Sequence, residues 1–210
     1  MSDRRSESRA AKRARDSAGD DTLNDSANPS LERAYKSRWA WLRFLLPAML
    51  GLAADLWAKE YTFPAGILRD SVTHRLLFPQ GRFRDAEALI PNVLVVQTTA
   101  NEGAVFGLGQ GNVRFFLVFS IVALGMITWV FCTSRIKQRW QQIALGLITA
   151  GALGNLYDRA TFGAVRDFLR FTVSWYPFIF NIADVLLCIG VPLLMLCWIF
   201  TKDPRKPAAK

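Results

Sequence analysis

Four aspartates stand inside or beside long apolar segments of this 210-residue chain, and they are the residues best suited to do chemistry: Asp55, Asp158, Asp167 and Asp184. Two carboxylates held in a partly dry site cannot both ionise cheaply, so one of them keeps a proton. Such a pair can take a proton from water with one member and protonate a carbonyl oxygen or a leaving amine with the other. No serine or cysteine has a credible base nearby, because the single histidine, His74, lies in a variable part of a loop. The residues therefore favour an aspartyl hydrolase.

Asparagines accompany two of these aspartates at a helical spacing. Asn181 precedes Asp184 by three residues, and Asn155 precedes Asp158 by three, so each pair is predicted to project from one face of a helix. Asp184 lies six residues inside a hydrophobic span, about 9 Å along a helix that rises ~1.5 Å per residue. Charges within a bilayer are costly, roughly 2.5–3.5 kcal/mol at a helix centre, so each one needs a reason.

The elements that must position these residues are four hydrophobic spans, each near the ~20 residues that cross a bilayer. They are predicted at Trp39–Trp57, Phe115–Cys132, Trp140–Tyr157 and Phe178–Phe200. We expect a mainly α, integral membrane protein: a four-helix transmembrane bundle over residues 39–201, with a disordered cytoplasmic tail at 1–38 and a cytoplasmic C-terminal tail at 202–210. Three cysteines and one histidine exclude a disulfide scaffold and disfavour a His/Cys metal site. No nucleic-acid partner is expected in spite of the net charge of +9, because no basic helix interleaves with aromatic residues.

Basic residues set the expected orientation. They flank the first span on its N-terminal side, fill the short link between spans two and three, and follow span four, so both termini are predicted to be cytoplasmic. The contrary sign is three arginines in the link between spans three and four: Arg159, Arg166 and Arg170. The long loop Tyr61–Arg114 then lies outside. Its apolar runs Ile90–Val96 and Ala104–Leu108, broken by Pro91 and by glycines, predict a small β subdomain (residues 61–112) on the outer, periplasmic surface.

This topology brings the polar residues to one depth. Spans one and three leave the membrane on the outer side and span four enters from it, so their polar residues converge there, and Asn101 of the outer loop can join them. Asp55 and Lys59 form an i, i+4 ion pair at the end of span one, for which a snorkelled structural pair is the favoured interpretation. From the residues alone, Asp158 is a better partner for Asp184 than Asp167 is, because Asp158 has the clearer helical context.

Four blocks within residues 39–201 resemble, in order, those of the bacterial lipoprotein signal peptidase (signal peptidase II) family. They are Asp55-Leu-Trp-Ala-Lys59, Asn101-Glu-Gly-Ala-Val-Phe-Gly107, Gly151-Ala-Leu-Gly-Asn-Leu-Tyr-Asp-Arg159 followed by Gly163-Ala-Val-Arg-Asp167-Phe, and Phe180-Asn-Ile-Ala-Asp184. The resemblance implies an aspartyl endopeptidase of the bacterial inner membrane, with no metal or organic cofactor. Such an enzyme removes the signal peptide of a prolipoprotein just before a cysteine that already bears diacylglycerol. It also implies membrane lipids as partners and the cyclic peptide globomycin as an inhibitor.

The family's roles transfer residue by residue. The resemblance assigns the catalytic pair to Asp167 and Asp184, with the site opening near the outer leaflet. Asp158 matches an aspartate that supports the site without attacking. The remaining family positions orient the pair, bind the substrate backbone or close span one; they are Asn101, Gly103, Asn155, Arg159, Asn181, Asp55 and Lys59.

The chain departs from the family pattern at several positions. Arg166 stands where an aliphatic residue is usual, and it either lowers the pKa of Asp167 or points at lipid phosphates. Ala58 replaces a usual serine or threonine, and residues 61–100 are longer than the usual outer element. Two other functions stay open: a small proton- or ion-coupled carrier that uses the same carboxylates, and an inactive lipoprotein-binding module. A carrier needs polar residues in the inner half of the bundle, where spans two and three have almost none.

Overall fold

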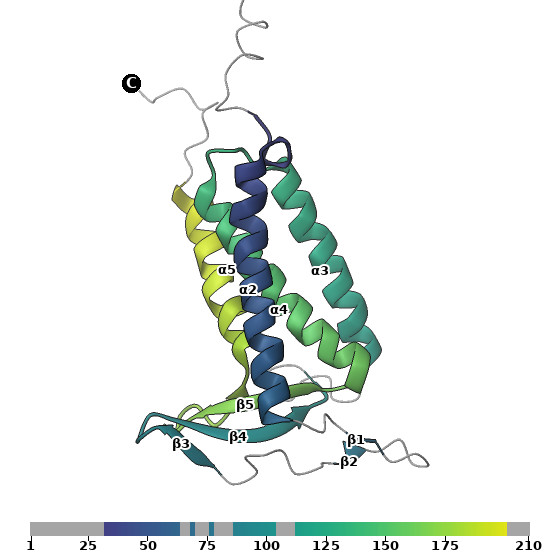
Figure 1. Cartoon of the computed structure of the whole chain (residues 1–210), viewed down its shortest axis with the longest axis vertical. Helices are drawn as coiled ribbons and strands as arrows, with labels where there is room; N and C mark the ends of the chain where they lie inside the picture. Colours follow the sequence, from purple (N-terminus) through teal and green to yellow (C-terminus); the bar gives the residue numbers. More distant parts are fainter. Residues whose placement is uncertain (1–31, 64–67, 70–75, 78–85, 104–111, 201–210) are drawn as a thin grey trace, which may run out of the picture.

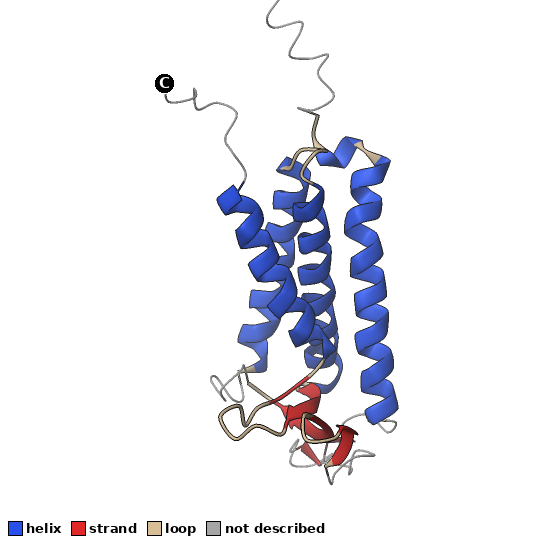
Figure 2. Ribbon diagram, turned by 90° about the vertical axis from the view of Figure 1, so that its left-hand side faces the viewer, coloured by secondary structure: helices blue, strands red, loops and turns tan. Residues whose placement is uncertain are grey.

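Four long helices run side by side, and the strands gather at one end of them (Figures 1 and 2). In this computed structural model the described residues are 32–63, 68–69, 76–77, 86–103 and 112–200. The helices are α2 (Arg38–Thr62), α3 (Val113–Thr133), α4 (Arg139–Phe162) and α5 (Ile182–Phe200). The helices α2 and α4 end, and α3 and α5 begin, at the end that carries the strands.

Three of these helices, α2, α3 and α5, are long and apolar enough to cross a membrane, as far as the described residues go. The fourth, α4, has 24 residues and packs against all three of the others. Several of its polar side chains face the interior of the bundle: Gln142, Asn155 and Asp158 are buried. The mainly helical membrane fold predicted from the sequence is thus confirmed. Buried polar residues on its central helix explain why α4 is less apolar than its neighbours.

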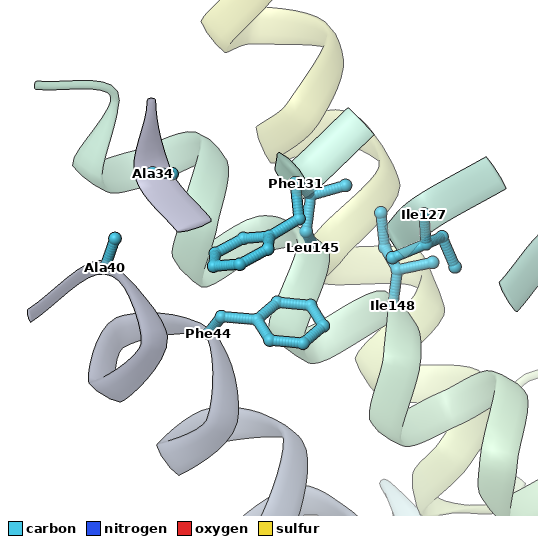
Figure 3. Close-up of a cluster of buried hydrophobic side chains, with 7 residues drawn as sticks. All are labelled: Ala34, Ala40, Phe44, Ile127, Phe131, Leu145 and Ile148. Atoms are coloured by element: carbon cyan, nitrogen blue, oxygen red, sulfur yellow. The ribbon is translucent and has the colours of Figure 1, made fainter. Parts of the chain in front are cut away.

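An apolar cluster holds the bundle together at the end away from the strands (Figure 3). Phe44 of α2 stacks on Phe131 of α3, with ring centroids 4.6 Å apart. Leu145 and Ile148 of α4 complete the contact between the helices. At this point α4 crosses α2 closely, and a Cβ atom on residue 146 would collide with the Phe44 carbonyl oxygen, so Gly146 permits the close approach. This packing fixes the positions of α2, α3 and α4 relative to one another.

The N-terminal approach to α2 belongs to the same cluster. The short helix η1 (Ala34–Lys36) buries Ala34 completely. The Ala34 amide donates to the Ser134 carbonyl at 2.8 Å, and the Ile136 amide donates to the Glu32 carbonyl at 3.0 Å. Residues 32–37, which the sequence analysis placed in the tail, are therefore packed against the α3–α4 link.

A four-stranded antiparallel sheet in the order β3-β4-β5-β6 closes the other end. Its strands are β3 (Glu87–Ile90), β4 (Leu94–Asn101), β5 (Val165–Phe171) and β6 (Ile179–Phe180); a separate pair joins β1 (Leu68–Arg69) to β2 (Leu76–Leu77). The predicted break at Pro91 is the β3–β4 turn, where Asn92 has φ 60°. The predicted run Ala104–Leu108 lies outside the described residues.

Half of this sheet comes from a segment in which the sequence analysis placed no strand. Strand β5 follows α4 and β6 precedes α5, so both lie in the link between spans three and four. The first four residues of β5 are all buried, so the strand shows no alternation of apolar and polar residues. Alternation is expected only where one face of a strand meets water, and it therefore could not reveal β5.

The start of α5 corrects the predicted depth of Asp184. The sequence placed a span at Phe178–Phe200, with Asp184 six residues inside it. The helix begins only at Ile182, because β6 takes up the preceding residues, and Asp184 is its third residue. Asn181 precedes the helix. The carboxylate is therefore in the first helical turn, and it does not carry the cost of a charge buried within a span.

Candidate active site

Asp167 is presented by the middle of β5, where the strand passes beneath the helix ends. Its side chain is 2% exposed. The Asn181 amide donates to Oδ1 at 2.6 Å, and the Asn101 amide, from the end of β4, donates to Oδ2 at 3.2 Å. Asp167 is therefore not a solvated loop acid. Each oxygen is held by an amide from a different element, so the direction of the carboxyl group is fixed.

Asp184 is held by the start of its own helix. The Asn181 backbone amide donates to Asp184 Oδ2 at 3.2 Å, and the Asp184 amide donates to Asn181 Oδ1 at 3.0 Å. This reciprocal pair has the geometry of a capping box, which satisfies amides that the first helical turn leaves open. The Asn155 amide of α4 donates to Asp184 Oδ1 at 2.9 Å. The amide end of a helix favours negative charge, so this position suits an ionised carboxylate.

Two asparagines connect the carboxylates in one hydrogen-bonded chain. The Asn181 side-chain amide donates to Asp167 and also to Asn155 Oδ1, the latter at 3.1 Å. Asn155 in turn donates to Asp184. Asn155 and Asn181 are both buried. The side chains that the sequence analysis expected to converge from spans three and four are therefore brought together with Asp167.

Burial makes the two carboxyl groups unequal. Desolvation, followed by repulsion from the Asp184 carboxylate, raises the pKa of Asp167 to about 8. The hydrogen bonds from Asn101 and Asn181 and the charge of Lys59 act in the opposite direction and are outweighed. The raised pKa favours the protonated form of Asp167. A carboxyl group that keeps its proton is suited to act as a general acid in hydrolysis.

Lys59 is the cation at the centre of the helix ends. Its ammonium lies 2.7 Å from Asp55 Oδ2 and 3.3 Å from Asp158 Oδ2, and it donates to Asn155 Oδ1 at 3.2 Å. Lys59, Asp55 and Asp158 are all completely buried. The interpretation of Asp55 and Lys59 as a snorkelled interfacial pair is therefore wrong, because neither side chain reaches the surface. The lysine instead joins α2 to α4.

Asp55 also joins α2 to α5. Its Oδ1 accepts a hydrogen bond from the Ala183 amide at 2.8 Å, in the first turn of α5. A Cβ atom on Gly154 of α4 would collide with the other carboxylate oxygen, so only glycine fits there. Gly154 thus lets α2, α4 and α5 approach one another closely at the site.

Asp158 is committed to ion pairs and not to Asp184. Its Oδ1 accepts from Arg166 Nη2 at 2.9 Å and from Nε at 3.1 Å, and its Oδ2 accepts from the Arg166 backbone amide at 2.9 Å. Both expectations for Arg166 are wrong, since the guanidinium points at neither Asp167 nor lipid. It also pairs with Glu60 at 3.2 Å, a residue that the sequence analysis missed and that no pattern singled out.

Arg159 reaches the loop that follows β4. Its Nη2 donates to the Gly103 carbonyl at 3.1 Å, and the guanidinium lies 5.0 Å from the centre of the Phe116 ring. The Gly103 amide donates to Asn101 Oδ1 at 3.0 Å. Arg159 and Gly103 therefore orient Asn101, one of the two amides on Asp167. Arg159 and Arg166 are both engaged by protein groups, which removes most of the contrary charge signal in this link. Across the described part of the chain, no group of three His, Cys, Asp or Glu side chains could hold a metal ion.

Comparison with known proteins gives the same family as the four sequence blocks. A family model described as signal peptidase (SPase) II matches residues 48–200. The chain is 35% identical to the lipoprotein signal peptidase of Staphylococcus carnosus over 143 residues, which cover 68% of this chain and 89% of the relative. It is 35% identical to that of Lactococcus lactis over 140 residues, covering 67% and 92%.

Two solved structures of bacterial membrane enzymes share the fold. One superposes with a TM-score of 0.62 at 28% identity, over 77% of this chain and 92% of the other. The second has a TM-score of 0.59 at 30% identity and covers 75% and 92%. The likeness thus extends over nearly the whole of each of the two solved chains.

Proposed function

This chain belongs to the signal peptidase II family of aspartic peptidases, multi-pass membrane enzymes of bacteria that remove signal peptides from prolipoproteins, and we propose that Asp167 and Asp184 are its catalytic pair. The observation that carries the assignment is the chain of hydrogen bonds Asp167–Asn181–Asn155–Asp184. Asp158, the alternative partner from sequence, has both oxygens engaged by Arg166 and Lys59. It supports the site as a structural acid.

The two carboxyl groups divide the work of the reaction. Asp184, in the first turn of α5, takes a proton from a water molecule whose oxygen attacks the scissile carbonyl carbon. Asp167, protonated at neutral pH, gives its proton to the carbonyl oxygen, which yields a neutral gem-diol. When the diol collapses, a proton passes from Asp184 to the leaving nitrogen, the C–N bond breaks, and Asp167 recovers its proton from the second hydroxyl.

The polar groups around the pair support substrate binding. Asn101 and Gly103 lie at the end of β4, and Arg159 is directed to the same loop. An extended peptide could add to this region through backbone hydrogen bonds, which need no particular side chains. The diacylglyceryl chains of the substrate cysteine would remain in lipid, and each buried CH₂ contributes roughly 0.8 kcal/mol to anchoring. The site requires no metal or organic cofactor, and globomycin would compete for it.

The location of the site supports a position near the outer leaflet of the inner membrane. All the residues in question lie at the end of the bundle where the sheet lies, and the start of α2 and the end of α5 lie at the opposite end (Figure 1). The basic residues between α3 and α4 are also at that opposite end. Because basic residues stay in the cytoplasm, the sheet and the site would face outward.

Cleavage of a diacylglyceryl-modified prolipoprotein by the purified enzyme tests this function. We expect cleavage by the wild type, and loss of at least about 100-fold in Asp167→Asn and in Asp184→Asn, because acid–base catalysis contributes 10²–10⁴-fold. The unlipidated precursor should not be cleaved. Glu102→Gln is the matched control: it makes the same carboxylate-to-amide change beside Asn101, at a residue with no role in the proposed reaction.

Three results would each contradict a part of this proposal. Full activity in Asp167→Asn would transfer the partner role to Asp158. Equal cleavage of the lipidated and unlipidated precursors would remove the lipid requirement while leaving the peptidase activity in place. Failure of folded wild-type protein to cleave either precursor would restore the carrier and binding-module alternatives.

A further inference from the structure

We propose that Arg166 is a positioning residue, which anchors β5 to α4 and α2 and thereby sets where the Asp167 carboxyl group lies. The inference rests on the proposed function, since it concerns the placement of the proposed catalytic acid. Arg166 is 1% exposed, and an arginine is seldom buried to this degree unless it is paired. Burial of Arg166 therefore requires partners for its guanidinium group.

Arg166 and Asp158 are joined by three hydrogen bonds. Two of them run from the guanidinium to Asp158 Oδ1, and the third runs from the Arg166 backbone amide to Oδ2. A single α4 carboxylate thus binds both the main chain and the side chain of one β5 residue. The guanidinium further contacts Glu60 at the end of α2, and lies 4.6 Å from the centre of the Phe162 ring at the end of α4. These contacts restrain β5 against both rotation and sliding.

Restraint at residue 166 acts directly on residue 167. Successive side chains of a strand point to opposite sides, so fixing the Arg166 side chain on one side of β5 determines the direction of the Asp167 side chain on the other. The neighbouring ladder does not supply this restraint alone. The pairing of β4 with β5 is irregular between Val96 and Thr99, and Thr99 is the partner of Asp167. Irregularities of this kind bend a strand and re-aim its side chains, so an additional anchor is needed beside Asp167.

The effect of Arg166 on Asp167 is one of position and not of charge. The charged groups that shift the pKa of Asp167 are Asp184 and Lys59. The guanidinium charge is balanced by Asp158 and Glu60, on the other side of the strand. An aliphatic residue at 166 would leave Asp158 with Lys59 and the backbone amide only. The arginine side chain therefore adds to the restraint that the Arg166 backbone amide places on β5.

Steady-state kinetics on lipidated precursor separate positioning from stability. For Arg166→Met we expect kcat to fall at least about tenfold with KM unchanged, because small misplacements of a catalytic group cost up to about 100-fold and Arg166 does not contact substrate. Arg166→Lys should recover part of kcat, since an ammonium can pair with Asp158 but cannot bridge to Glu60 as well. Glu60→Gln weakens only the outer ion pair, in which Glu60 is 67% exposed, and it should therefore lower kcat less than Arg166→Met does.

The same assay includes wild type and Asp167→Asn, and thermal unfolding reports the folded state of every variant. Unchanged kcat in folded Arg166→Met, with only a lower melting temperature, would overturn the inference. If that variant does not fold, Arg166→Lys decides: reduced kcat at unchanged KM supports positioning, and wild-type kcat overturns it. Active Asp167→Asn would instead refute the catalytic pair itself, so the two failures are distinguishable.

Discussion

At the scale of single residues, Asn101 and Asn181 give the Asp167 and Asp184 carboxyl groups different hydrogen-bond partners. Asn181 donates to Asp167 with its side chain and to Asp184 with its backbone, so one residue holds both groups. Of the two carboxyl groups, Asn101 binds only that of Asp167. Its hydrogen bond favours the ionised form and so keeps the pKa of Asp167 lower than burial and Asp184 would otherwise set it. Asn101 can therefore be used to tune the acid without touching Asp184.

The alkaline limb of the pH profile tests this arrangement. If protonated Asp167 is the acid, kcat/KM should fall as pH rises through about 8, where that group loses its proton. Asn101→Ala removes a bond to the ionised form, so the pKa rises and the limb should move to higher pH. The measurement is kcat/KM against pH for wild type, Asn101→Ala and Glu102→Gln, the last of which should leave the limb in place. A shift to lower pH in Asn101→Ala would contradict the assignment of the acid.

The contact between three helices determines the site at the scale of elements. Gly154 lets α4 approach Asp55 of α2 and Ala183 of α5, and Asp55 caps α5 through the Ala183 amide. The start of α5, and with it Asp184, is therefore placed by a residue of α2. A change in the spacing of α4 should move the base relative to the acid even though no catalytic residue is altered.

Alanine at position 154 tests that spacing. A Cβ atom there would meet the Asp55 carboxylate and lie 3.3 Å from Ala183 Cβ, so Gly154→Ala should destabilise the fold by about 1–3 kcal/mol and lower kcat. Gly125→Ala on α3 is the matched control. Its Cβ would meet nothing within 4 Å among the described residues, and it should be neutral or stabilising by about 0.5–1 kcal/mol. Thermal unfolding and kcat report both; equal behaviour of the two variants would contradict the close-contact role.

Orientation is a property of the whole molecule. The sheet and the α3–α4 link lie at opposite ends of the bundle, so they should be exposed on opposite sides of the membrane (Figure 2). The link also carries Arg135, Lys137 and Arg139, and such basic residues favour a cytoplasmic location for it. The outward position of the site in our proposal depends on this arrangement.

Labelling of single cysteines tests the orientation. In a chain whose three cysteines are replaced by serine, Glu87→Cys on the exposed face of β3 should react with a membrane-impermeant maleimide on intact cells. Lys137→Cys, also exposed, should react only after the membrane is permeabilised. The cysteine-free chain measures background labelling. The reverse pattern would place the sheet in the cytoplasm and refute the outward-facing site.

The sequence by itself determined the features that depend on local composition and spacing. Long apolar runs specify the membrane helices, because within a single segment a helix is the structure that satisfies its own backbone hydrogen bonds in lipid. The turn at Pro91 and the helical Asn155–Asp158 spacing are likewise local. The convergence of polar residues at one end of the bundle follows from the order of the spans. These inferences required no knowledge of which side chains touch.

Only the tertiary structure shows which of Asp158 and Asp167 is held in ion pairs. Asp158 and Asp167 are both acids near one helix end, and only the contacts of Arg166 and Lys59 with Asp158 leave Asp167 beside Asn181. Strand β5 was not recognised because its first residues are buried on both faces, which removes the alternating pattern. The choice between salt bridge and acid depends on distances of a few ångströms between segments far apart in the chain. Spacing within one segment does not contain that information.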